Sequence, residues 1–188
     1  MRFVAGPVSG PRAFGDRALK VVVLRDPKES IRKCSLTPLR RRNDFTFLEW
    51  RGGLSLFDAS GMTLLAVDAP SLSRVDSGRP VLVLDCSWKK VERMTRCLRG
   101  EPPRRSIPEG LVTAYPRKSK TFPDPEAGLA SVEALFVASL VLGEEDRSLL
   151  EGYPFVLDFL ERNRGALERA RSEKAAPGIS ASASAGEG

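Results

Sequence analysis

The sequence predicts an α/β protein in which a mostly parallel sheet is covered by helices on both faces. Two observations lead to this fold class. Residues 81–84 (VLVL) are apolar at every position, which is typical of a central strand covered on both sides. Residues 131–142 (SVEALFVASLVL) are apolar nearly all round, which is typical of a buried helix. The chain of 188 residues is long enough for one domain with a sizeable core.

The remaining strands are expected mainly in the first part of the chain. Residues 20–25 (KVVVLR) form a short β-branched run that stops at an Asp-Pro turn. A basic loop with about one helical turn follows over residues 26–42. Residues 45–50 and 53–57 alternate apolar and polar positions, and the Arg-Gly-Gly between them predicts two paired strands joined by a tight turn. A further strand is expected over residues 63–67.

Helices are expected to follow the central strand. Residues 88–98 have helical spacing of their apolar side chains, and the Gly and Pro residues after them end the helix. A short strand is expected over residues 110–114 and a loop over 115–128. At the start of the buried helix, Ser131 is an N-cap or first-turn residue, and Glu133 is favoured there by the helix dipole.

The end of the chain predicts two more helices and a tail. A short helix is expected over residues 146–150 and an amphipathic one over 153–170, interrupted near Gly165. The last residues are low in complexity and predict a disordered segment. The expected organisation is an amino-terminal leader (1–19), a single domain with a basic amino-terminal part (20–172) and a disordered tail (173–188).

The chain contains no histidine, and this excludes several chemistries. Ser-His-Asp and Cys-His nucleophilic sites are impossible, as are zinc sites that contain histidine. Three cysteines are too few for a four-cysteine zinc site, so no metal is expected. Any proton transfer must use carboxylates, Lys, Tyr, Cys, water or the substrate.

Positive charge is concentrated in one part of the chain. Residues 1–120 carry 24 basic and 12 acidic residues, and residues 121–188 carry 6 basic and 12 acidic residues. A basic region of this kind favours a nucleic-acid partner, although solvated charge runs are the alternative. The candidate phosphate contacts are Arg40, Arg41, Arg42, Arg117, Lys118 and Lys120.

The cysteines and the apolar runs indicate a compartment. Cys34, Cys86 and Cys97 are odd in number and lack CxxC spacing, so a disulfide framework is not expected. This pattern fits a reducing, cytoplasmic environment. The first residues lack the apolar core of a signal peptide, and no apolar run approaches the length of a membrane span.

Three segments are candidates for ligand contact. In residues 84–88 (LDCSW), Asp85 follows a buried strand, where α/β proteins place their ligands, although an Asp there also caps helices. Residues 105–108 (RSIP) precede a predicted strand and otherwise form an ordinary turn. Residues 128–134 lead into the buried helix, whose first amides bind anions or are simply capped. The chain has no GxGxxG or Walker motif, which weakens ordinary nucleotide-binding readings.

Together these segments resemble the ribosomal RNA aminocarboxypropyltransferases, which depend on S-adenosylmethionine. The similar motifs stand in the family's order: Asp26-Pro27-Lys28 with Lys33-Cys34-Ser35, then LDCSW, RSIP and LASVEAL at residues 129–135. The resemblance implies a SPOUT-like knotted fold, distantly related to the DTW-domain proteins. It also implies transfer of a 3-amino-3-carboxypropyl group to N3 of a uridine or pseudouridine in small-subunit rRNA, with release of methylthioadenosine.

The resemblance also implies a site. Ser35, Leu84, Ile107 and Ser131 fall on cofactor-binding positions of the family, and Asp85 is the candidate base or the group that orients the cofactor. The implied partner is small-subunit rRNA or a pre-ribosomal particle, bound by a monomer.

One departure from the family leaves two other functions open. The family's Asn-Pro-Val-Asn-Tyr-Gly stretch is absent from residues 114–122. A non-catalytic, RNA-binding ribosome-assembly factor and a SPOUT-type RNA methyltransferase are therefore the alternatives.

Overall fold

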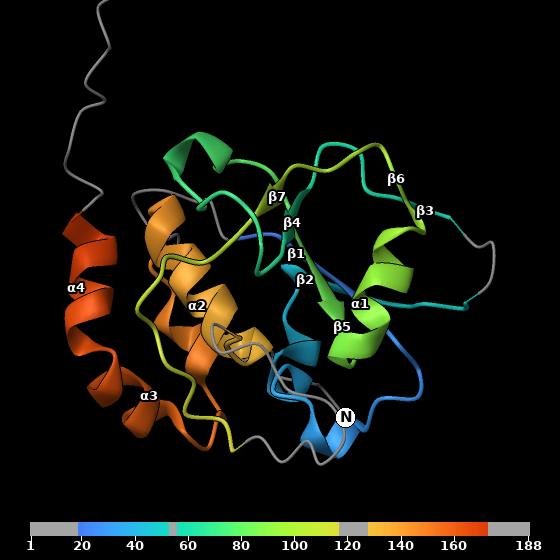
Figure 1. The fold of residues 1–188 in the computed structure, drawn as a ribbon. Coiled ribbons are helices and arrows are strands. Elements are labelled where there is room, and N and C mark those ends of the chain that lie inside the picture. Colours follow the sequence, from blue (N-terminus) through green and yellow to red (C-terminus); the bar gives the residue numbers. More distant parts are fainter. Residues whose placement is uncertain (1–18, 53–55, 117–127, 173–188) are drawn as a thin grey trace, which may run out of the picture.

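The computed structural model describes residues 19–52, 56–116 and 128–172 (Figure 1). This part of the chain holds a five-stranded sheet in the order β2-β1-β5-β4-β7, and all of its pairings are parallel. Its strands are β1 (Val21–Arg25), β2 (Phe45–Glu49), β4 (Thr63–Leu65), β5 (Val81–Asp85) and β7 (Arg104–Arg105). A smaller parallel pair joins β3 (Phe57–Asp58) to β6 (Leu98–Arg99). The predicted mostly parallel α/β architecture is confirmed.

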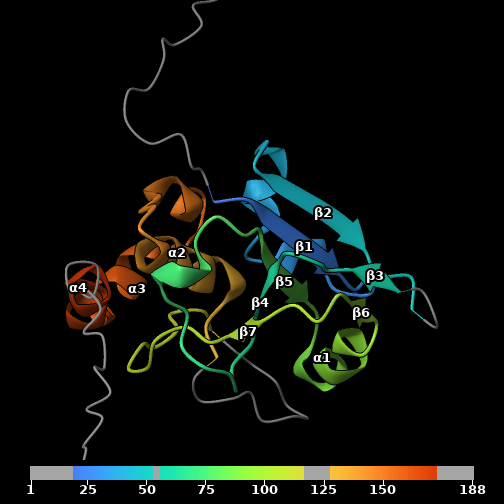
Figure 2. The same ribbon diagram turned by 90° about the horizontal axis from the view of Figure 1, so that it is seen from above.

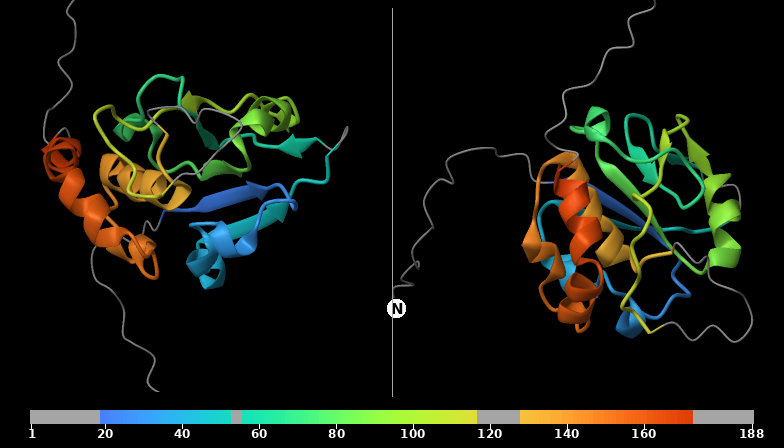
Figure 3. Two further views of the ribbon diagram at one scale, coloured as in Figure 1. Left: turned by 60° about the horizontal axis from the view of Figure 1, so that its bottom comes forward. Right: turned by 60° about the vertical axis from the view of Figure 1, so that its left-hand side comes forward.

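Helices cover both faces of the main sheet (Figure 2). Helix α1 (Trp88–Thr95) lies on one face and α2 (Ser131–Leu142) lies on the other. Helices α3 (Val156–Arg162) and α4 (Arg164–Ser172) lie outside α2, on the side away from the sheet (Figure 3). The short 3-10 helices are η1 (Ile31–Lys33), η2 (Thr37–Arg41), η3 (Arg74–Asp76) and η4 (Arg147–Leu150).

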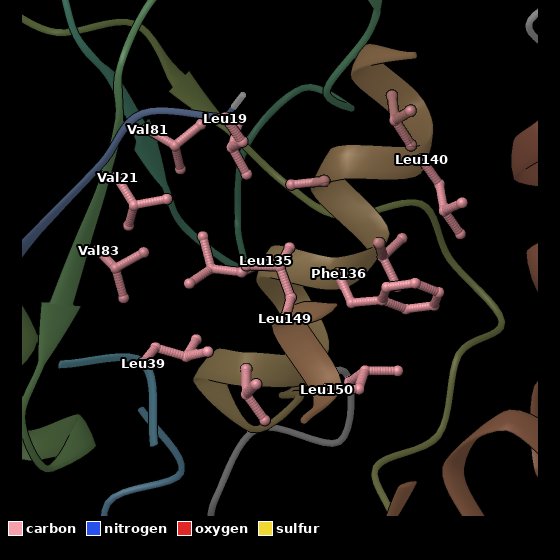
Figure 4. Packing of buried hydrophobic residues seen from close by; sticks show 14 of the residues in the cluster. Leu19, Val21, Leu39, Val81, Val83, Leu135, Phe136, Leu140, Leu149 and Leu150 are labelled. Atoms are coloured by element: carbon pink, nitrogen blue, oxygen red, sulfur yellow. The ribbon is translucent and has the colours of Figure 1, made fainter. Parts of the chain in front are cut away.

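The two-residue period of the strands divides the core between the two faces. Val21 and Val81 point toward α2, where they join Leu135 in the larger cluster (Figure 4). Leu24 and Leu82 point the other way and pack in the cluster that contains Met94 of α1. Because β5 is central and buried on both sides, its apolar run has the form that the sequence predicted.

The predicted pair of strands at 45–50 and 53–57 is wrong in its pairing. Strand β2 pairs in parallel with β1, and β3 pairs with β6 in the other sheet. In the β1–β2 register, Phe45 and Phe47 join the core on the α2 face. Burial of these rings is worth more than a local turn preference, so the Arg-Gly-Gly signal does not decide the pairing.

The strand expected at 110–114 does not form. Its backbone groups bind side chains instead of a neighbouring strand: Val112 N–H donates to Asn163 Oδ1 at 2.7 Å, and Ala114 N–H donates to Glu133 Oε1 at 2.9 Å. Asn163 also donates from Nδ2 to the Val112 carbonyl at 2.8 Å. The strand that does form here, β7, lies earlier, at the start of the RSIP segment.

Two helix boundaries also differ from the prediction. Helix α1 ends at Thr95 because Leu98 and the residue after it pair with β3. The last helix is interrupted at Asn163 and not at Gly165. The side chain of Asn163 is buried and hydrogen-bonds to the backbone of Val112. Apart from Leu19, the predicted leader (1–19) and tail (173–188) lie outside the described residues. None of the helices in the described ranges is both long and apolar enough to cross a membrane.

Candidate active site

A cavity of about 720 Å³ opens at the carboxyl ends of β4, β5 and β7. Its walls come from several separate parts of the chain, which include residues 34–35, 64–68, 84–88 with one face of α1, 106–107 and 129–131. This is the edge of a parallel sheet at which α/β proteins bind ligands, and the volume lies in the range of small-molecule sites.

All four residues predicted to bind the cofactor line this one cavity, together with Asp85. Leu84 and Asp85 end β5, and Ile107 follows β7. Ser131 is the first residue of α2, since the N-cap position belongs to Ala130. Ser35 comes from the loop between η1 and η2. The structure thus brings together motifs that are far apart in the sequence.

Ser35 connects the first motif to the last. Its Oγ accepts a hydrogen bond from Val132 N–H at 3.3 Å. The N-cap residue, Ala130, has no polar side chain, so the hydroxyl of Ser35 satisfies an amide that would otherwise lack a partner at the start of α2. The predicted anion-binding amides of this helix start are therefore already partly occupied.

Asp85 is held by two partners at the edge of the cavity. Its Oδ2 lies 3.2 Å from Arg25 Nη1 and accepts a hydrogen bond from Cys34 Sγ at 3.1 Å. The Arg25 side chain is 5% exposed and also donates to the Glu29 carbonyl at 2.8 Å. The alternative role of Asp85 as the cap of α1 is not what the structure shows, because Ser87 holds the N-cap position and no side chain caps the helix. Ser87 N–H donates instead to Glu29 Oε1 at 3.1 Å.

The loop after β1 is fixed to α1 by a second ion pair. Asp26 is buried and pairs with Lys90, which also lies 3.9 Å from Glu29 Oε1. Burial alone would raise the pKa of Asp26, but the hydrogen bond and charge of Lys90 outweigh it and hold that pKa below its usual value. The walls formed by the first motif and by α1 are thereby tied to each other.

The cysteines beside the cavity are poor nucleophiles. Burial, with a contribution from Asp85, raises the pKa of Cys34 to about 11. Burial and the charge of Glu29 raise that of Cys86 to about 12. Because only the thiolate attacks, neither group is suited to covalent catalysis at neutral pH.

We expect slow alkylation of Cys34 and Cys86 in the native protein. Raising a thiol pKa from 9.0 to about 11 lowers the thiolate fraction near pH 8 by about 100-fold. Peptide mass spectrometry after timed iodoacetamide treatment measures each rate, with the same chain in denaturant as control. The native rates should still rise above pH 10, where the unfolded rates level off. Native rates that level off near pH 9 would contradict the assignment.

The arginine triplet has two different environments. Arg40 and Arg41 are exposed on η2, and the Arg40 guanidinium lies 5.0 Å from the centre of the Phe47 ring. Arg42 is 23% exposed and its Nη2 lies 2.6 Å from carboxylate oxygens of both Asp44 and Asp146. Arg42 therefore joins the start of β2 to the start of η4. The other predicted phosphate contacts, Arg117, Lys118 and Lys120, lie outside the described residues.

We expect Arg42→Ala to destabilise the protein by about 1–3 kcal/mol, because it leaves two partly buried carboxylates without their shared cation. The hydrogen bonds from Ser148 and Arg42 overcome burial and lower the pKa of Asp146. The stabilisation is thus present above pH 4 and is lost as the pH falls through that lowered pKa. Urea unfolding of the wild type, Arg42→Ala and the exposed control Arg41→Ala measures the effect. If the difference in the free energy of unfolding between the wild type and Arg42→Ala stays the same in acid, the prediction is wrong.

The comparisons with known proteins agree with this geometry. The family model described as "Ribosome biogenesis protein, C-terminal" matches residues 63–185. The chain belongs to this family. The match begins at β4, so it covers every lining residue of the cavity except Glu29, Cys34 and Ser35.

A solved structure extends the likeness to most of the chain. It is that of the SAM-dependent rRNA:acp-transferase Tsr3 from Vulcanisaeta distributa, with 27% sequence identity and a TM-score of 0.61. The similarity covers 81% of this chain and 82% of the other. Among proteins of curated function, none matches the chain significantly.

Sequence reasoning missed two buried charged groups of this family member. Arg25, the last residue of β1, supplies the partner of Asp85. Glu133 has a larger role than the helix-dipole effect expected of it, since it accepts four hydrogen bonds. The signal for Glu133 was a charged residue inside an otherwise apolar run, whereas Arg25 stands at the end of one. Among residues 19–52, 56–116 and 128–172, no group of His, Cys, Asp and Glu is arranged to hold a metal ion.

Proposed function

We propose that this protein transfers the 3-amino-3-carboxypropyl group of S-adenosylmethionine to small-subunit rRNA. The observation that carries the proposal is the meeting of Ser35, Leu84, Ile107 and Ser131 in one cavity beside Asp85. Membership of a ribosome biogenesis family and similarity to a SAM-dependent rRNA:acp-transferase support it. The acceptor is N3 of a uridine or pseudouridine, and methylthioadenosine is released.

The residues of the cavity fit S-adenosylmethionine. Leu84, Ile107 and Leu129 give an apolar wall suited to adenine and to the methyl group. The carboxylates of Glu29 and Asp85 border the same space and suit a ligand that carries a sulfonium and an ammonium. Bound S-adenosylmethionine supplies an electrophilic carbon next to its sulfonium.

The group that is transferred depends on which carbon attached to the sulfonium meets the nucleophile. The methyl and the γ-carbon of the methionine arm are both attached to sulfur, and only the carbon held in line with N3 reacts. We assign the apolar wall to cover the methyl, so that the arm faces the opening. Asp85 either orients the ammonium of the arm or takes the N3 proton, and Arg25 fixes its carboxylate in place.

The RNA contacts follow from the exposed cations. Arg96 and Arg104 line the cavity, and Arg40 and Arg41 are exposed on η2. We assign these four side chains to rRNA phosphates, together with Arg117, Lys118 and Lys120. Arg42 is assigned mainly to the fold, because its guanidinium is engaged by two carboxylates.

The proposal keeps three finer features that were expected from the sequence. They are a SPOUT-like knotted path of the chain, a monomeric state and a cytoplasmic location. An experimental structure with a continuous trace tests the first, sedimentation tests the second and fractionation of cells tests the third.

Mass spectrometry of small-subunit rRNA from a deletion strain tests the function. We expect one fragment to lose the mass of a single aminocarboxypropyl group and to regain it when the gene is restored. Loss of a methyl mass instead would indicate a methyltransferase. An unchanged rRNA map with defective subunit assembly would favour the non-catalytic assembly factor, which the missing Asn-Pro-Val-Asn-Tyr-Gly stretch also favours.

A further inference from the structure

Glu133 is a buried carboxylate that binds three separate segments. It is 0% exposed and is the third residue of α2. Its Oε2 accepts from Ala130 N–H at 2.8 Å and from Thr113 Oγ1 at 2.6 Å. Its Oε1 accepts from Ala114 N–H at 2.9 Å and from Tyr153 Oη at 2.8 Å.

These four donors compensate the charge of the buried carboxylate. Within the described parts of the chain, no Lys or Arg forms an ion pair with Glu133. A buried carboxylate is costly unless hydrogen bonds replace its water shell, and two donors on each oxygen do so here. Substitution of the carboxylate therefore leaves several donors unsatisfied at once.

Two of the three segments are walls of the cavity. Segment 111–116 carries Tyr115, and the hydroxyl of Thr113 also accepts from Tyr115 N–H at 3.1 Å. Residues 128–130 carry Leu129 and lead into Ser131. Segment 111–116 pairs with none of the strands in the described ranges, and side-chain acceptors hold its backbone in place.

We propose that Glu133 is a positioning residue for S-adenosylmethionine. It does not line the cavity itself, but it sets the distance between the wall at Tyr115 and the wall at Leu129. Its substitution therefore weakens cofactor binding and leaves the exposed arginines that face RNA in place. The inference rests on the proposed function, in which this cavity holds the cofactor.

Glu133→Gln tests the inference because it keeps the shape of the side chain. The amide NH₂ would face a backbone N–H that can only donate, so at least one wall segment loses its hydrogen bond. By calorimetry we expect the Kd for S-adenosylmethionine to rise about tenfold or more, with RNA affinity unchanged. Hydrogen exchange at the amides of Ala114 and Ala130 should accelerate, while exchange in β5 should not.

Tyr153→Phe is the matched control. It removes one of the same four hydrogen bonds from a residue that is outside the cavity wall, so it lowers stability but should change the Kd by less than about twofold. A folded Glu133→Gln protein with the wild-type Kd would overturn the inference. An equal loss of affinity in Tyr153→Phe would also overturn it, since general destabilisation would then be the cause.

A second pair of variants applies if Glu133→Gln does not fold. Thr113→Val removes a donor to Glu133 and the acceptor of Tyr115 N–H, whereas Thr113→Ser keeps both. We expect weaker cofactor binding in the Val variant and recovery in the Ser variant; equal affinities would overturn the inference. If the wild type binds no S-adenosylmethionine, the proposed function fails instead, and the exchange rates still report whether Glu133 holds the two segments.

Discussion

Ile107→Asp is expected to abolish measurable binding of S-adenosylmethionine without unfolding the protein. Ile107 lies in the loop after β7, is half-buried and borders the cavity. An unpaired carboxylate at the apolar wall costs about 3–4 kcal/mol on binding, which lowers affinity by a few hundredfold. Calorimetry on a variant with a wild-type circular dichroism spectrum gives the affinity.

The control for this prediction is a set of substitutions at the same position. Ile107→Val keeps an apolar surface and should bind nearly as well as the wild type. Ile107→Lys introduces the opposite charge and should bind as poorly as Ile107→Asp, because both replace an apolar contact with a charged group. If the Asp variant binds normally, the placement of the cofactor against Ile107 is wrong.

Asp85→Asn is expected to reduce both turnover and stability. Removal of its charge leaves Arg25 without a counter-ion at 5% exposure, and breaking a buried pair in this way costs about 3–5 kcal/mol. Loss of activity in the single variant would therefore not separate a catalytic role from a structural one. A variant that removes both charges of the pair distinguishes the two roles.

The double variant Arg25→Gln/Asp85→Asn removes both charges of the pair. We expect urea unfolding to show a recovery of stability, because no buried charge is left alone. Turnover should stay low, by about 100-fold or more, if the carboxylate acts on the cofactor or on N3. Activity that returns together with stability would show that Asp85 serves only as the partner of Arg25.

The sequence was sufficient for the elements whose own residues determine their burial. Strand β5 and helix α2 are apolar on nearly all sides, so the residues of each segment alone predict that it lies in the core. The motifs at the ends of strands predicted a shared site for a different reason: the carboxyl ends of parallel strands lie at one edge of the sheet. The structure places Leu84 and Ile107 at that edge as expected.

The elements that were predicted wrongly depend on partners distant in the sequence. Residues 110–114 have the composition of a strand, but side chains from α2 and from Asn163 bind their backbone. The Arg-Gly-Gly turn gives no information on whether β2 lies beside β1 or beside a following strand. The pairing of Arg25 with Asp85 likewise joins two strands, and no local pattern specifies it.

The central claim is that the transferred group is aminocarboxypropyl, and a comparison of two labels tests it most directly. The protein is incubated with small-subunit RNA from the deletion strain and with S-adenosylmethionine labelled either on the methyl or on the carboxyl carbon. We predict carboxyl label in the RNA and methyl label in released methylthioadenosine. Methyl label in the RNA, or neither label when the cofactor and RNA both bind, would contradict the claim.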